Sequence, residues 1–138
     1  MPNRLTLTAI LLSLAFTTQA EGIKLTPGKW QIQITSSMSM MPQPIIKKLE
    51  ECIKADQLSP EELMKNSGTC SVSDVKSSGS QISWKMVCKH HGGEMAGTGQ
   101  FKSAGSKMNG SMELAMDLNG QALTILNKWD GQRIGDCK

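Results

Sequence analysis

Residues 70–101 read CSVSDVKSSGSQISWKMVCKHHGGEMAGTGQF, and this stretch decides the fold of the chain. It predicts two tandem β-hairpins, Cys70–Cys88 and Ile82–Phe101, because apolar and polar residues alternate on both sides of turns rich in Gly and Ser. A cysteine stands at each end of the first hairpin, and Gly97 and Gly99 interrupt the second. The residues that follow continue the alternation, so we take this stretch as the start of one antiparallel sheet.

The same alternation with a period of two extends in both directions from this stretch. It predicts a mainly β fold, a six-stranded antiparallel meander that curves into a half-barrel or partly open barrel. Asn119-Gly120 is a strong signal for a two-residue hairpin turn between the last two strands. The expected strands cover residues 29–40, 70–76, 81–89, 94–103, 108–118 and 121–129.

The phase of the side chains fixes how these strands pair, because a slip of one residue would turn the buried face outward. The Asn119-Gly120 turn pairs Leu118 with Gln121. Four-residue turns over 104–107 and 91–94 continue this register and place Cys88 opposite Gly97. One row of inward-facing residues is then expected to cross four strands: Trp84, Phe101, Gly110 and Trp129.

Two segments outside the strands are predicted to cover one side of the sheet. Residues 59–67 suit a short capped helix, in which Ser59 is the N-cap and Glu62 completes a capping box. Residues 44–53 suit a helical turn, because apolar residues recur at spacings of three and four. A strand near residues 51–54 is the competing interpretation of that segment.

Residues 1–20 have the pattern of a cleaved signal peptide. Arg4 supplies a positive start, residues 5–16 form an apolar run, and a small residue stands at both positions that a signal peptidase reads in Thr18-Gln19-Ala20. The run is shorter than the ~20 residues that a membrane-spanning helix needs. We therefore expect a periplasmic protein with one disulfide-stapled β domain at residues 21–138 and no transmembrane segment after cleavage.

An even number of cysteines in an exported chain predicts disulfides, and four cysteines allow three pairings. Their spacing matches no zinc-site pattern, because no C-x-x-C occurs. The first hairpin places Cys70 opposite Cys88, at a separation that a disulfide can bridge. We therefore favour Cys70–Cys88 together with Cys52–Cys137. The same register points Asp74 inward, which a β-bulge near this residue would correct.

Charge and motifs argue against several classes of protein. The chain has 15 Lys+Arg and 12 Asp+Glu, interspersed, for a formal net charge of +3 at pH 7. A nucleic-acid partner is not expected, because such binders show a basic stripe. The motifs G-x-S-x-G and H-E-x-x-H and a glycine-rich phosphate loop do not occur in the sequence. We expect a protein that is not an enzyme and has no catalytic residues.

Methionines and histidines form two groups of soft ligands that suit copper, above all Cu(I). The candidate metal ligands are Met38, Met40, Met41, His90 and His91. In the alternative interpretation, the methionines at 38 and 40 continue the buried face of their strand and the two histidines form an exposed turn. Copper handling is thus the second function that we consider, and no other cofactor is expected.

The inward face of the predicted sheet carries methionines and aromatic rings. Methionine adapts to irregular shapes and is common at binding surfaces of broad specificity. A curved sheet with such a face can hold a lipid or another apolar small molecule, unless residues 44–67 fill the space. The candidate face comprises Trp84, Met86, Phe101, Met112, Met116 and Trp129.

Several short motifs, taken in order along the chain, resemble one family. They are LTPGKW at 25–30, VKSSG at 75–79, WKMVC at 84–88, GTG at 97–99 and RIGDC at 133–137. Together they resemble the exported bacterial family called domain of unknown function 3617. The resemblance implies a small exported protein, usually of Gram-negative bacteria, without an established activity. We therefore expect an uncharacterised cell-envelope module that binds an apolar small molecule or lipid, or an envelope protein.

Overall fold

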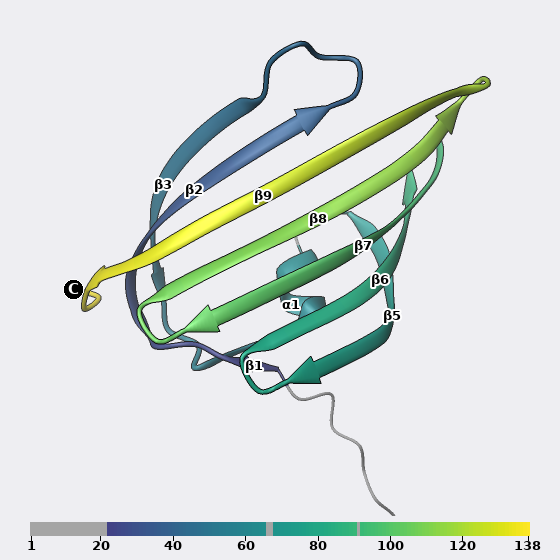
Figure 1. The fold of residues 1–138 in the computed structure, drawn as a ribbon. Coiled ribbons are helices and arrows are strands. Elements are labelled where there is room, and N and C mark those ends of the chain that lie inside the picture. Colours follow the sequence, from purple (N-terminus) through teal and green to yellow (C-terminus); the bar gives the residue numbers. More distant parts are fainter. Residues whose placement is uncertain (1–21, 66–67, 91) are drawn as a thin grey trace, which may run out of the picture.

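The chain folds around one antiparallel sheet of seven strands (Figure 1). This computed structural model describes residues 22–65, 68–90 and 92–138. The signal peptide predicted at residues 1–20 lies outside the described residues. No helix in the described part of the chain combines the length and the apolar character that crossing a membrane requires.

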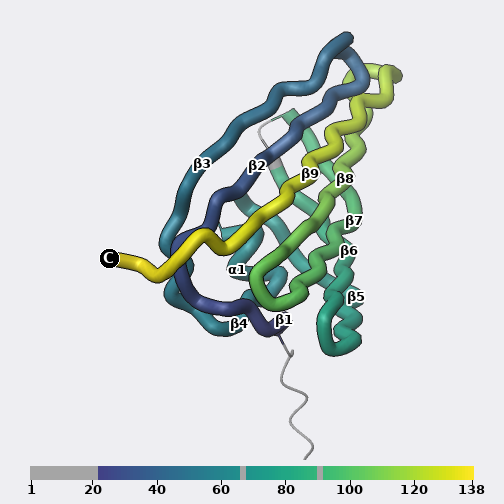
Figure 2. The backbone as a smooth tube through the Cα atoms, turned by 60° about the vertical axis from the view of Figure 1, so that its left-hand side comes forward, coloured from purple at the N-terminus to yellow at the C-terminus, as the bar shows by residue number. Residues whose placement is uncertain are grey.

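The strands of the large sheet follow the order β3-β2-β9-β8-β7-β6-β5. Their bounds are β2 Gly28–Met38, β3 Ile45–Ile53, β5 Thr69–Ser78, β6 Gln81–His90, β7 Gly93–Ala104, β8 Lys107–Leu118 and β9 Gln121–Gly135. A two-stranded ribbon pairs β1 (Ile23–Lys24) with β4 (Gln57–Leu58). The sheet is bent, and the short helix α1 (Pro60–Met64) lies on its concave side (Figures 1 and 2).

The prediction of a mainly β, antiparallel fold is confirmed, but the large sheet has seven strands instead of six. Within the described residues, its edge strands β3 and β5 do not pair with each other, so the sheet stays open. The additional strand is β3, and the helical turn expected over 44–53 is therefore wrong. The edge of β2 offers this segment a ladder along its whole length, and the β-branched Ile45, Ile46 and Ile53 favour a strand.

Most of the predicted register is confirmed. The turn at Asn119-Gly120 pairs Leu118 with Gln121, and Phe101 faces Gly110 across the β7–β8 hairpin. Cys70 faces Cys88 across the β5–β6 hairpin. The register shifts between Ser73 and Lys76, and Asp74 adopts a positive φ of 50° within this irregularity. The expected bulge therefore lies at Asp74, and the Asp74 side chain is exposed instead of pointing inward.

The predicted pairing of β6 with β7 is wrong by two residues. His90 pairs with Gly93, so the turn is tighter than the four residues expected over 91–94. Cys88 therefore faces Met95, not Gly97, and Trp84 does not face Phe101. Because the offset is even, every side chain keeps its predicted face of the sheet. The inward row that contains Phe101 now comprises Ile34, Trp129, Gly110, Phe101 and Ile82.

Two glycines in the middle of the sheet let tryptophan rings lie flat on a neighbouring strand. Trp84 faces Gly99, and a Cβ atom at Gly99 would stand 2.3 Å from Cε2 of the Trp84 ring. Trp129 faces Gly110, and a Cβ atom there would stand 2.4 Å from Cε2 of the Trp129 ring. Such distances are far below van der Waals contact, so a side chain at either glycine would push the ring away.

Helix α1 is shorter than predicted, because it spans Pro60–Met64 instead of 59–67. Its start is the predicted one: the backbone N–H of Glu62 donates to Oγ of Ser59 at 3.2 Å. The helix ends before residues 66–67, which lie outside the described residues. Met64 and Pro60 are buried against the rest of the protein, so packing holds this helix of 5 residues in place.

The structure contains two disulfides, Cys70–Cys88 and Cys52–Cys137, which is the pairing favoured from the sequence. Cys70–Cys88 joins neighbouring strands with a Cα–Cα distance of 4.0 Å, and Cys88 is buried. Cys52–Cys137 joins the end of β3 to the tail after β9, 85 residues away in sequence. Two disulfides in a small domain are typical of proteins that fold in an oxidising, exported environment.

Candidate ligand-binding cleft

A cleft of about 520 Å³ opens between the concave face of the sheet and α1. The sheet forms its floor with Ile32, Ile34, Trp84, Phe101, Met108, Met112, Asn127 and Trp129. The wall consists of the end of the edge strand β3 with Glu51, Cys52 and Ile53, of Lys54 and Ala55 after it, and of Leu58, Glu62, Leu63 and Met64 in and beside α1. Its size falls within the ~300–1,000 Å³ typical of small-molecule sites, which are also mainly apolar.

Aromatic rings form the centre of the floor. The ring centroids of Phe101 and Trp129 lie 6.4 Å apart at an interplanar angle of 30°. Gly110 seats the Trp129 ring on β8, which leaves Trp129 half-buried with one face toward the cleft. Trp84 is buried more deeply, at 2% exposure. The floor is therefore an apolar surface whose two tryptophan rings are seated on glycines.

The wall opposite the floor is positioned by the cap of α1. Ser59 begins the helix, and the residues on either side of the cap, Leu58 and Leu63, are the pair expected for a hydrophobic staple. Both leucines line the cleft, together with Met64 from the end of the helix. Both leucines and the buried Met64 pack against the hydrophobic core, so the apolar side of the helix faces the sheet.

Polar groups in the cleft are few. Asn127 lies on the floor, where its Oδ1 accepts a hydrogen bond from Oγ of Ser36 at 2.7 Å. The charged side chains of Glu51, Lys54 and Glu62 line the wall and are exposed, so they stand where the cleft meets solvent. Nε1 of Trp84 is buried and has no hydrogen-bond partner among the described residues. The floor of the cleft is therefore apolar, and the charged groups stand at its mouth.

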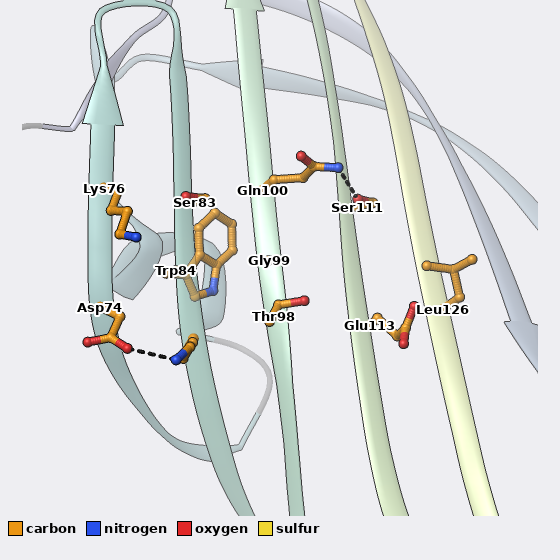
Figure 3. A pocket seen from close by; sticks show the side chains of 11 residues that line it. Asp74, Lys76, Ser83, Trp84, Thr98, Gly99, Gln100, Ser111, Glu113 and Leu126 are labelled. Atoms are coloured by element: carbon orange, nitrogen blue, oxygen red, sulfur yellow. Dashed lines mark hydrogen bonds and ion pairs between the residues drawn. The ribbon is translucent and has the colours of Figure 1, made fainter.

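A second hollow, of about 590 Å³, lies on the convex face of the sheet (Figure 3). Its side chains are mostly polar, and several bond to one another. Lys85 forms an ion pair with Asp74 at 3.0 Å, and Nε2 of Gln100 donates to Oγ of Ser111 at 3.1 Å. Although this hollow is slightly larger, the concave cleft is the better candidate site, because apolar enclosure is what distinguishes ligand pockets.

The structure brings four of the six predicted apolar-face residues together in the cleft: Trp84, Phe101, Met112 and Trp129. Met86 is buried in the core, and Met116 is half-buried nearer the β8–β9 turn. The sequence predicts that residues 44–67 cover this side of the sheet, but it places 44–53 in a helical turn and so misses that the wall begins with a strand. The staple leucines were a usable signal, since an apolar pair around an N-cap must pack on something.

Among the described residues, the predicted methionine and histidine ligands lie on or next to strands far apart in the sheet. Met38 ends β2, while Met40 and Met41 are exposed in the turn that follows. His90 ends β6, four strand spacings from β2 or roughly 19 Å along the sheet. His91 lies outside the described residues. The described chain contains no cluster of three or more His, Cys, Asp or Glu side chains placed to hold a metal ion. Copper binding by either group stays a prediction.

Comparison with known families adds one finding. A family model described as "Protein of unknown function (DUF3617)" matches residues 25–137. Searches of curated proteins and of solved structures give no match. The matched range covers β2 through the Cys137 disulfide and includes every strand of the large sheet. The chain therefore belongs to the DUF3617 family of proteins of unknown function.

Proposed function

We propose that this protein is a non-catalytic binding module that holds an apolar small molecule or lipid in the concave cleft. The observation that carries the proposal is the lining of the cleft, where tryptophan, phenylalanine, methionine and branched aliphatic side chains surround about 520 Å³. Removing apolar ligand surface from water supplies the binding energy, at about 25 cal/mol per Å².

The distribution of polar groups supports a ligand with one apolar body and one polar end. Asn127 is the one uncharged amide among the lining residues, and its Oδ1 is already engaged by Ser36. The charges at the mouth are of both signs, from Glu51, Lys54 and Glu62. The ligand body is therefore apolar, and its specificity for a head group is set outside the floor.

A matched pair of variants on β8 tests this proposal. Met112→Glu places a carboxylate on the cleft floor, while Ala115→Glu places one on the exposed convex face of the same strand. The neutral probe N-phenyl-1-naphthylamine, titrated by its emission, is expected to bind the native protein. Met112→Glu should weaken this binding roughly tenfold or more, because a buried charge needs compensation.

Ala115→Glu should bind the probe as the native protein does. Equal far-ultraviolet circular dichroism of both variants establishes that the sheet is intact. A native protein that does not bind the probe, or two variants that bind it equally well, would overturn the proposal. Mass spectrometry of the protein purified without detergent then identifies the natural ligand.

A further inference from the structure

Strand β3 leaves one edge of the sheet open. In the described chain it pairs only with β2, and its register with β2 runs without a bulge from Ile45 to Ile53 (Figures 1 and 2). The outward N–H and C=O groups of such a strand are a template for another strand. Its side chains at 45–48 and 50–52 are exposed, including Ile45 at 52% and Ile46 at 59%.

In the sequence of β3, IIKKLEECI, charges of opposite sign stand at equal distances on the two sides of Leu49. Two lysines precede this residue and two glutamates follow it. Lys47 and Glu51 lie on the concave face, because they pair with the inward-facing Ile34 and Trp30. Lys48 and Glu50 lie on the convex face. Each face of the edge therefore carries one positive and one negative side chain, at equal distances from Leu49.

We propose that β3 is a dimerisation edge that pairs antiparallel with β3 of a second copy of this chain, across a two-fold axis at Leu49. In this register Lys48 faces Glu50 of the second copy, and Lys47 faces Glu51 of the second copy. The axis repeats both contacts, so four Lys–Glu pairs form. The same register sets Ile45 opposite Ile53, which covers an exposed apolar side chain at each end.

Geometry favours a second copy over other occupants of this edge. Residues at equal distances from Leu49 lie on the same face of the strand, so the concave faces of both sheets point to the same side. Charges on an edge strand normally repel a neighbouring strand. An antiparallel copy in this register sets each of the four charges opposite an unlike charge, although Glu50 also pairs with Lys29 of its own chain, whereas a parallel copy would set lysine beside lysine. Directly opposed unlike charges stabilise a strand pair, and like charges weaken it.

Charge reversal tests the proposed register. The K47E/K48E variant and the E50K/E51K variant each place like charges opposite one another in a homodimer. Sedimentation velocity, over a micromolar to submillimolar concentration series, should show a dimer for the native protein. Each reversed variant should dimerise at least roughly tenfold more weakly. Lys102→Glu on the convex face of β7 is the control for net charge, and it should dimerise like the native protein.

Two recombinations distinguish register from simple destabilisation. A mixture of K47E/K48E with E50K/E51K should form a mixed dimer, and the fourfold swap K47E/K48E/E50K/E51K should regain its homodimer. The unfolding midpoint of E50K/E51K and of the fourfold swap accounts for the loss of the Lys29–Glu50 ion pair, whose Nζ and Oε2 atoms lie 2.5 Å apart. Amide hydrogen exchange of β3 should slow as the dimer forms.

A native protein that remains monomeric over the whole series would overturn the proposal. Reversed variants that dimerise as tightly as the native protein would overturn it too, because the contact would then lie elsewhere. Failure of the two reversed variants to combine would exclude the Leu49 register. None of these results depends on ligand binding in the cleft, so the two proposals stand or fall separately.

Discussion

The two edges of the sheet, β5 and β3, are built differently. On β5 the register is broken between Ser73 and Lys76, and Asp74 bulges outward to form an ion pair with Lys85. A bulge of this kind twists an edge away and discourages further pairing. On β3 the ladder is unbroken, and lysines on one side of Leu49 are matched by glutamates at equal distances on the other side. A backbone bulge therefore interrupts the β5 edge, whereas the β3 edge keeps the regular backbone that the proposed dimer requires.

The disulfides follow the same division. Cys70–Cys88 ties β5 to the adjacent strand and spans 18 residues of sequence. Cys52–Cys137 ties the end of β3 to the tail of the chain and spans 85 residues. The β5 edge is thus fastened locally, whereas the β3 edge is fastened by a contact between distant parts of the sequence.

Removing the two disulfides in turn should give the largest effects. In the chain-entropy model a disulfide stabilises more when it closes a longer loop. Cys52→Ala/Cys137→Ala should therefore lower the free energy of unfolding by about 4.5 kcal/mol, and Cys70→Ala/Cys88→Ala by about 3 kcal/mol. Urea unfolding measures both values.

Hydrogen exchange shows where each loss falls. The first double variant should speed exchange in β3, and the second should speed exchange in β5. If the Cys70/Cys88 pair proves the costlier one to lose, then the burial of Cys88, not loop entropy, dominates the stability of the edges.

A change in the middle of the sheet should weaken both edges alike. Gly110→Ala would bring a Cβ atom against the Trp129 ring, and forcing extra volume into a packed site costs about 1–3 kcal/mol. Exchange should quicken in β3 and in β5 together. Gly92→Ala is the control, because a Cβ atom there meets nothing within 4 Å. Unchanged stability of Gly110→Ala would mean that the indole is not seated on the glycine.

The smallest effect concerns the ion pair on the β5 edge. A hydrogen bond and the charge of Lys85 hold the pKa of Asp74 below its ordinary value of 3.8. A carboxylate with a lowered folded pKa stabilises the fold above its unfolded pKa, and this contribution disappears as the pH falls through the folded pKa.

An NMR titration should therefore give Asp74 a midpoint below 3.8, and Lys85→Gln should raise it. Because both side chains are exposed, salt should diminish the shift. An unchanged midpoint in Lys85→Gln would assign the shift to another group.

Much of the sheet could be predicted because its turns carry strong local chemistry. Asn119 adopts a positive φ of 54° and Gly120 one of 88°, as expected for a tight hairpin turn, and the alternation on both sides fixes the pairing. The β6–β7 turn is less constrained, since Gly92-Gly93 allows more than one turn length. Strand β3 was missed because its apolar residues fit a helical as well as an extended pattern, and only the presence of β2 decides between them.

The cleft was half predictable for a related reason. Its floor follows from the alternation within single strands, which is local in sequence, so Trp84, Phe101, Met112 and Trp129 could be named. Its wall depends on the end of the edge strand β3 and on the placement of α1 over the sheet. The pairing of β3 with β2 and the packing of Leu63 and Met64 against the core are contacts between distant parts of the chain, which no local spacing encodes.

The pairing of His90 with Gly93 determines which changes in chain length the β6–β7 turn can accept. The sorting of side chains into concave and convex faces survives any even change in the length of this turn, although the rows shift. Deleting or inserting a single residue would instead invert the whole β5–β6 hairpin relative to β7. Trp84 would then leave the cleft, and the Cys70–Cys88 disulfide would move to the outer surface. Length variation at this turn is therefore tolerable in steps of two.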